Sequence, residues 1–303
     1  TANRVSNTQK VFNVLDYGAV RYNSFPLPAN ATDSVPQIQQ AINDASTAGG
    51  GVVYVPAGYY SIGMNSPNDR PLVVLEKVTL AGAGMDATVL VDNLHVTLTQ
   101  RGVVESDQAL WNPPVPPATS GSWSVKWHIC IRDLSVYAGS INSGDHAGVF
   151  LRGVAESLVE NVCVDGQYSA QTYHFARGIF LQGWVNNINN CFVHECIQGF
   201  NLSFMDWLPD SVPNPSTNFT NATYLSGCHF EGGMMPDDQT GCYVAGVANT
   251  IVGCTFEKRF EADQNQNPPR DTVGVHIAGT MFGPPGAQGL ICSTNTTIMG
   301  IYL

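Results

Sequence analysis

Acidic residues recur at one position relative to a repeated segment. Asp145, Asp238 and Asp271 each stand three residues before a glycine that opens a short apolar stretch, and Glu195 stands four residues before another. If these stretches stack as parallel strands, equivalent carboxylates lie ~5 Å apart in neighbouring strands and ~10 Å apart in alternate ones. Those separations bracket the ~5–5.5 Å and ~6.5–9.5 Å between the paired carboxyls of retaining and inverting glycosidases. The column therefore predicts acid–base chemistry on a glycosidic bond, unless each Asp only caps its own turn.

A long insertion after the third repeat supplies further candidate residues. Asp206 and Trp207 lie in it, and Asp237 stands beside Asp238. Loops carried on a rigid scaffold are where catalytic residues usually lie, so both aspartates are predicted catalytic candidates. Trp207 is predicted to form the wall of a sugar subsite, and the alternative is that its ring plugs a gap in the packing.

The residue between the two apolar positions of each repeat is expected to face solvent. Down the stack these residues are Phe150, Phe180, Asn201, Tyr243 and His276, and the next outward position after Phe180 is Gln182. Aromatic faces and amides suit a sugar chain, so Phe180, Tyr243, His276 and Gln182 are predicted to bind substrate. The alternative is that this stripe packs under a loop or against a second subunit.

One repeat departs from the acidic column. Ahead of its glycine, Gly178, it carries His174 and Arg177 in place of a carboxylate. We include both among the predicted substrate-binding residues, because a cation at this place favours an acidic sugar.

These predictions depend on two interleaved strand motifs. The first reads Gly-apolar-x-apolar and the second is centred on cysteine, and both recur at intervals of about 20–40 residues. Such a period predicts a solenoid of stacked β-strands. The first motif opens at Gly148, Gly178, Gly199, Gly241 and Gly274, and the second contains Cys130, Cys163, Cys191, Cys228, Cys254 and Cys292.

The first residues of the chain differ from the repeats. A strand is predicted at 11–15, and apolar residues at helical spacing predict one helix at 33–48, capped by Asp33 or Ser34. We expect a single domain, 1–303, with an N-terminal cap at 1–60 and solenoid coils at 61–303. Loop insertions are expected at about 107–124 and 203–224.

The N-terminal sequence resembles a known superfamily. Residues 12–19 (FNVLDYGA), 50–60 (GGVVYVPAGYY) and 78–84 (VTLAGAG) are similar to the signature of the pectate-lyase-like proteins. The resemblance implies a single-stranded right-handed parallel β-helix with an N-terminal capping helix. Members include polysaccharide lyases, glycoside hydrolases, fructotransferases and phage tailspikes, many of them trimers. The segment 21–32 departs from the signature, being longer and containing two prolines, which indicates an altered cap loop.

The cysteines are expected to be mainly stacked core residues. In Cys228-His229-Phe230 and Cys254-Thr255-Phe256 the Cys and Phe share an inward face, whereas Cys130 and Cys163 alternate with inward aliphatic residues and point outward. The alternative for Cys191 and Cys196 is a disulfide across a turn.

Composition limits the partners. The 303 residues include 13 Lys+Arg and 24 Asp+Glu, for a net charge of −11, and only 12% are charged. With this small number of cations the chain cannot make extensive contacts with phosphates. Neither nucleic acid nor an anionic membrane is therefore an expected partner. Few charges with many Gly and Asn residues fit an all-β solenoid.

The leading prediction is a glycoside hydrolase, without a cofactor, that cleaves a neutral or weakly charged polysaccharide along the outside of the helix. A polysaccharide lyase acting on a uronate polymer is the alternative, supported by Arg177, and it would bring in Ca²⁺. A tailspike or structural β-helix, assembled as a homotrimer, is the hypothesis from another class. The expected location is extracellular (secreted) or the surface of a virion.

Overall fold

The computed structural model describes residues 9–301 apart from twelve gaps. The gaps are 65–68, 95–100, 108–124, 140–146, 167–174, 203–219, 233–238, 245, 259–271, 278–279, 283–288 and 292–295. Both expected loop insertions fall largely within them.

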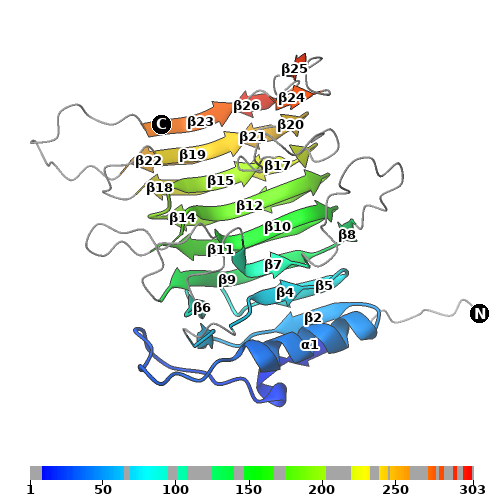
Figure 1. Cartoon of the computed structure of the whole chain (residues 1–303), viewed down its shortest axis with the longest axis vertical. Helices are drawn as coiled ribbons and strands as arrows, with labels where there is room; N and C mark the ends of the chain where they lie inside the picture. The colour runs from blue at the N-terminus through cyan, green and yellow to red at the C-terminus, as the bar shows by residue number, and fades with distance from the viewer. Residues whose placement is uncertain are drawn as a thin grey trace, which may run out of the picture.

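The strands stack in parallel into two long sheets, with the N-terminal strands at one end and the C-terminal strands at the other (Figure 1). Sheet B has ten strands: β4 (Leu72–Val74), β7 (Gly102–Ser106), β10 (Ala147–Ala155), β12 (Arg177–Trp184), β15 (Gln198–Leu202), β19 (Gln239–Val244) and β23 (Thr272–Ile277), with β8 (Lys126–Trp127), β16 (Thr220–Asn221) and β20 (Gly246–Val247) beside them. This sheet contains the Gly-apolar-x-apolar motif.

Sheet A has fourteen strands. They are β1 (Val11–Asn13), β2 (Gly51–Tyr54), β5 (Val78–Ala81), β9 (Cys130–Ala138), β11 (Leu158–Asp165), β13 (Asn187–Asn189), β17 (Tyr224–Ser226), β21 (Thr250–Val252) and β26 (Thr297–Met299), together with β3 (Gly58–Ile62), β6 (Thr88–Asp92), β14 (Phe192–His194), β18 (His229–Gly232) and β22 (Thr255–Lys258). Apart from these sheets, β24 (Thr280–Phe282) and β25 (Gly289–Ile291) form an antiparallel pair. The predicted parallel β-helix is confirmed, and parallel crossovers wind right-handed in about 98% of cases.

Sheet A bends once in every coil, which gives the coil three straight runs. The bend follows a column of residues in the left-handed backbone region, with φ of 57° at Asp133, 51° at Asn161, 49° at Asn190, 58° at Gly227 and 60° at Gly253. Asn and Asp tolerate this region through short polar side chains. The amides also form a ladder, since Asn190 Nδ2 donates to Asn161 Oδ1 at 2.7 Å and Asn161 Nδ2 donates to Asp133 Oδ1 at 2.9 Å.

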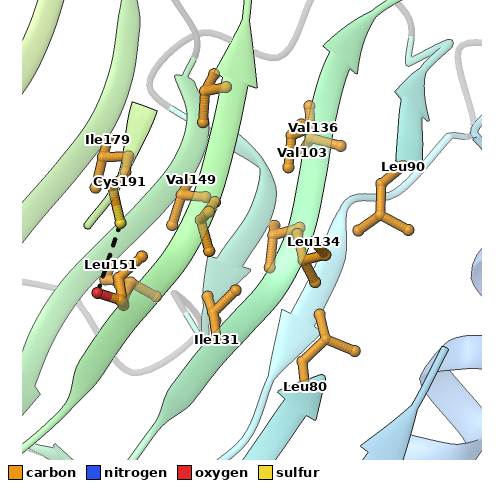
Figure 2. Packing of buried hydrophobic residues seen from close by; sticks show 14 of the residues in the cluster. Leu80, Leu90, Val103, Ile131, Leu134, Val136, Val149, Leu151, Ile179 and Cys191 are labelled. Atoms are coloured by element: carbon orange, nitrogen blue, oxygen red, sulfur yellow. Dashed lines mark hydrogen bonds between the residues drawn. The ribbon is translucent and has the colours of Figure 1, made fainter. Parts of the chain in front are cut away.

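The interior is filled by columns of aliphatic side chains from facing runs (Figure 2). Register places Leu80 beside Ile131, and Val149 beside Ile179, in neighbouring coils. Such columns bury apolar area continuously along the helix axis, which stabilises every coil through its neighbours.

The glycines that open the sheet B strands have a packing role. A Cβ at Gly178 would lie 2.7 Å from the Gly199 carbonyl oxygen and would overlap the Val193 side chain, and a Cβ at Gly199 would lie 2.5 Å from the Phe230 ring. The motif therefore needs glycine because the backbone of sheet B approaches side chains of sheet A too closely for any Cβ.

The cysteines follow the predicted division between core and outer side, except that Cys163, expected to point outward to solvent, is buried at 5% exposure. Cys191, Cys228 and Cys254 are buried in the core, each in the next coil at the bend of sheet A, and Cys191 lies among aliphatic residues in Figure 2. Cys130 is half-buried on the outer side. Cys191 and Cys196 are both free, so the alternative of a disulfide between them is wrong.

One helix, α1 (Val35–Thr47), covers the N-terminal end of the stack (Figure 1). Its start is fixed by Asp33, whose Oδ1 accepts from Val35 N at 2.9 Å. The strand predicted at 11–15 ends earlier, because Asn13 Oδ1 accepts from Leu15 N and the 3₁₀ helix η1 (Val14–Tyr17) follows. Within the part of the chain that the structure covers, no helix is both long and apolar enough to cross a bilayer.

Substituting Gly178→Ala is expected to destabilise the protein by about 1–3 kcal/mol, since overpacking forces the two sheets apart. Gly227→Asn is the matched control: no atom lies within 4 Å of its Cβ position, and its φ of 58° suits Asn. Urea unfolding measures both. Equal stability of Gly178→Ala and the native protein would contradict the close approach of the sheets.

The buried thiols are expected to resist alkylation in the native protein. Burial raises the pKa of Cys163 to about 12, and it also raises the pKa of Cys242 and Cys196 above the ordinary thiol value. Little thiolate, the reactive form, is then present at about pH 8. Mass spectrometry after iodoacetamide treatment should show Cys130 labelled before these three, and fast native labelling of Cys242 would contradict the core assignment.

Candidate functional site

Most of the predicted catalytic residues lie outside the described residues. These are Asp145, Asp206, Asp237, Asp238 and Asp271, and the predicted binding residues His174 and Trp207 lie outside them as well. Glu195 is described. It occupies the corner after β14 with a φ of 51°, and its backbone N–H donates to the Glu231 carbonyl at 3.0 Å.

Parallel register aligns the predicted outward stripe of sheet B. Phe150 pairs with Phe180, Phe180 with Asn201, Asn201 with Tyr243, and Tyr243 with His276. The same row continues through Glu105 in β7 to Val73 in β4. The alignment predicted from the repeat is therefore present, and it places one residue of each coil in a continuous row.

The expectation that the whole stripe is open to solvent is wrong. Phe150 and Phe180 are each 1% exposed, and they cluster with Ala147, apart from the main core. Their rings stack with centroids 4.4 Å apart and an interplanar angle of 13°. The alternation along the strand predicted correctly on which side of the sheet the two rings lie. Each ring is covered, however, and does not present a free face to a sugar.

Two other predicted binding residues are also buried. Gln182 is 1% exposed and pairs with Arg152 across β10 and β12, and Arg177 is 6% exposed at the start of β12. In the same row as the phenylalanines, Tyr243 is half-buried, and the buried Asn201 Nδ2 donates to Gln198 Oε1 at 2.6 Å. Among the described side chains of this row, Tyr243 and Val73 are therefore the partly accessible ones.

A buried ion pair stands at the N-terminal end of this face. Glu105 is fully buried, and the Arg101 guanidinium donates from Nε to Glu105 Oε2 at 2.7 Å and from Nη2 to Oε1. Burial raises the pKa of Glu105, while the hydrogen bond and charge of Arg101 act in the opposite direction. Sequence reasoning missed this pair, although the spacing of four residues between an Arg and a Glu was the available signal.

Four cations gather on this sheet. Arg101 and Lys126 are ion-paired with Glu105 and with Asp107 (3.5 Å), respectively. Arg152 and Arg177 flank the phenylalanine stack, one on each side along the strands. Burial lowers the pKa of Arg152 to about 10. We call Arg101, Lys126, Arg152 and Arg177 on sheet B the cationic face.

The outward surface of sheet A is acidic, in contrast to the cationic face. Register aligns Asp165, His194, Glu231 and Glu257 in successive coils, and His194 Nδ1 lies 3.3 Å from a Glu231 carboxylate oxygen. The net negative charge of the chain is therefore not spread evenly, because this surface carries carboxylates where sheet B carries arginines.

The described residues offer no ready metal site. No group of three or more His, Cys, Asp or Glu side chains in this part of the chain is arranged to hold a metal ion.

A family model described as "Rhamnogalacturonase A/epimerase, pectate lyase-like" matches residues 11–229. The chain belongs to this family. The match covers the cap, the N-terminal and central coils of both sheets and the cationic face, and it confirms the pectate-lyase-like resemblance of the N-terminal sequence.

Curated relatives match over shorter stretches. Mannuronan C5-epimerase AlgE3 of Azotobacter vinelandii is 44% identical over 80 residues, 26% of this chain and 4% of the relative. Alginate lyase 7 of the same organism is 39% identical over 98 residues, 31% of this chain and 10% of the relative. The matched stretches are thus small parts of these relatives.

Among solved structures, the A-module of the A. vinelandii Mannuronan C-5 epimerase AlgE4 is similar, with a TM-score of 0.46 and 21% identity. It covers 82% of this chain and 58% of the module. The tailspike protein of E. coli bacteriophage HK620 has a TM-score of 0.46 and 13% identity, over 80% of this chain and 45% of the tailspike.

Removing Arg101 is expected to leave Glu105 as a buried carboxylate without its counter-charge. Arg101→Ala should destabilise the fold by roughly 3 kcal/mol at about pH 7. Without the arginine the carboxyl pKa rises further, so the loss should shrink as the pH falls toward about 4 and the carboxyl is protonated. The double variant Arg101→Ala/Glu105→Gln removes the charge and should recover much of the loss. Denaturant unfolding at both pH values measures this, and a pH-independent loss would contradict it.

Proposed function

We propose that this protein is a carbohydrate-active enzyme that binds a uronate-containing polysaccharide over the cationic face of sheet B. The observation that carries the proposal is the presence of two arginines, Arg152 and the buried Arg177, at the two ends of the phenylalanine stack, within a chain that has few cations. Relatives named as mannuronan C5-epimerases and an alginate lyase support an acidic polysaccharide as the substrate class.

The reaction we favour starts with removal of the proton at C5 of a uronate. That proton is acidified when the adjacent carboxylate is neutralised, because the charge that develops is delocalised onto the carboxylate oxygens. We assign Arg152 and Arg177 to this neutralisation, each on a different uronate carboxylate at its own end of the phenylalanine stack, since guanidinium groups bind carboxylates with paired hydrogen bonds. Epimerisation and elimination share this first step. In epimerisation a proton is then added to the opposite face of C5, and in elimination the 4-linked group leaves.

Hydrolysis is the competing proposal. It requires two carboxylates close to the glycosidic oxygen, and the candidates Asp145, Asp238 and Asp271 lie outside the described residues. On sheet B, Glu105 and Asp107 are both held by cations, which leaves them poorly suited to act as acid and base. The low cation count of the chain had favoured a neutral substrate, but four of the 13 Lys and Arg residues lie together on the cationic face.

Three properties remain proposals that follow from the family rather than from this site. We retain an extracellular or virion-surface location, a homotrimer as one assembly to be tested by light scattering, and Ca²⁺ as a requirement to be tested by chelation. None of them is needed for the role assigned to the arginines.

The reaction class is tested by incubating the protein in D₂O with polymannuronate, polygalacturonate and a neutral β-glucan. Deuterium at C5 without chain shortening identifies an epimerase, and ultraviolet absorbance from unsaturated ends identifies a lyase. New reducing ends without unsaturation identify a hydrolase, and Asp238→Asn and Asp271→Asn should then abolish cleavage. Activity confined to the neutral glucan would overturn the proposal.

Replacing an arginine of the cationic face is expected to weaken action on a uronate polymer. Arg152→Gln and Arg177→Gln should each lower kcat/KM by about 10- to 100-fold, the range for a lost charged hydrogen bond. Arg132→Gln is the control, because it removes one cation from the outward face of sheet A, where Arg132 pairs with Asp133. Thermal unfolding identifies variants that fail to fold, and Arg152→Lys should keep more activity than Arg152→Gln. Full activity in both Gln variants would contradict the assignment.

A further inference from the structure

A cavity of about 270 Å³ lies between the cap loop and the ends of three strands. Residues 25–31 of the loop form one wall. The opposite wall consists of Met64 after β3, Val91 and Asn93 at the end of β6, and Gly139 after β9. This loop belongs to the segment that departs from the superfamily signature, and its lining residues include none of the cationic face.

The loop is held in place at both of its ends. Tyr22 and Tyr59 exchange backbone hydrogen bonds of 2.8 and 2.9 Å, and the Tyr22 hydroxyl accepts from Thr32 N at 2.8 Å. Between these points, the Phe25 ring stacks on Tyr59 with centroids 6.1 Å apart. The cavity is therefore preformed, so a ligand would not have to order the loop on binding.

A polar group on the strand side is also fixed. Asn93 Nδ2 donates to Ser61 Oγ at 2.7 Å, and the Ser61 hydroxyl donates to the Gly63 carbonyl at 2.9 Å. This chain of hydrogen bonds orients the Asn93 amide at the end of β6. On the facing loop, the amide of Asn30 is exposed.

The lining combines apolar surfaces with amides and carries no charge among the described residues. Phe25, Pro26, Pro28, Val91 and Met64 provide carbon surfaces, and Asn30 and Asn93 provide donors and acceptors. An anion would lose its hydration here without gaining a counter-charge, and a hydrocarbon would leave the amides unsatisfied. A neutral molecule with C–H faces and hydroxyl groups satisfies both kinds of surface.

We propose that this cap-loop cavity binds a single neutral monosaccharide unit. The volume lies just below the ~300–1,000 Å³ of pockets for drug-sized ligands, which fits one sugar ring and not an extended chain. The site goes beyond the proposed function, because it takes an uncharged ligand and requires no reaction.

The proposal is tested by titrating the intact protein with methyl glycosides of neutral hexoses, followed by isothermal calorimetry and by ligand-observed NMR. Methyl glucuronide and methyl galacturonide serve as charged probes of the same size. We expect at least one neutral glycoside to saturate one site per chain, and the uronides to bind ~10-fold more weakly or not at all, since a lone buried carboxylate is disfavoured.

Two variants locate the site. Ala29→Trp places a large side chain at the exposed loop position that lines the cavity and should abolish binding, whereas Thr47→Trp, at the exposed end of α1, should leave it unchanged. Asn30→Ala removes one amide and should weaken binding by ~3- to 10-fold, as expected for one hydrogen bond. Circular dichroism and thermal unfolding confirm that each variant is folded.

Absence of saturable binding by every neutral glycoside at millimolar concentration would overturn the proposal, as would unchanged affinity in a folded Ala29→Trp variant. Tighter binding of the uronides would also overturn it. Failure of this site is distinguishable from failure of the proposed function, because the turnover of uronate polymers is measured separately and depends on Arg152 and Arg177.

Discussion

Parallel stacking at a strand spacing of ~4.8 Å is the constraint on which the rest of the molecule depends. Each coil places the same position of the repeat beside its equivalent in the next coil. The residue type at each position must therefore fit the equivalent residues in the coils on either side. The left-handed bend of sheet A accepts Asp133, Asn161, Asn190 and then glycine for this reason. The small residue at the start of each sheet B strand follows from the same constraint, since Gly178 and Gly199 lie where the two sheets meet.

The same stacking also limits where charged residues can lie. Because neighbours in a column are only about one strand apart, like charges repel strongly unless they are paired or separated by neutral residues. On sheet B the outward row contains Glu105, which is held by Arg101 and lies next to the neutral Phe150, followed by Phe180. On sheet A, His194 interrupts the carboxylates and lies 3.3 Å from Glu231. The two surfaces therefore reach opposite character by the same stacking rule.

Sequence periodicity predicted which side of a strand each residue takes. Cys228 and Cys254 lie inside, Cys130 lies outside, and Phe150 aligns with Phe180, all as the alternation indicates. Periodicity could not predict that the two phenylalanines are covered, because alternation within a strand carries no information about the chain that lies over it. The Arg101–Glu105 pair was missed for a related reason, since a charged side chain in an apolar strand is normally taken as exposed.

The cap-loop cavity could not be predicted from the sequence at all. It forms where residues 25–31 meet Asn93 and Gly139, which are far apart in the chain. They are adjacent only because strands β3, β6 and β9 end at the same corner of the stack.

The position of the cations matters more to the substrate class than the net charge does. Interactions between exposed charges are screened beyond about 8 Å at physiological ionic strength, and the carboxylates of sheet A lie on another side of a packed helix. Their influence on an anionic polymer at sheet B is therefore weak compared with that of Arg152 and Arg177. Partial burial strengthens this difference, because the desolvated Arg152 interacts through a lower dielectric than water. Under the proposed function, a chain with a net charge of −11 recognises a uronate through these two arginines despite its overall charge.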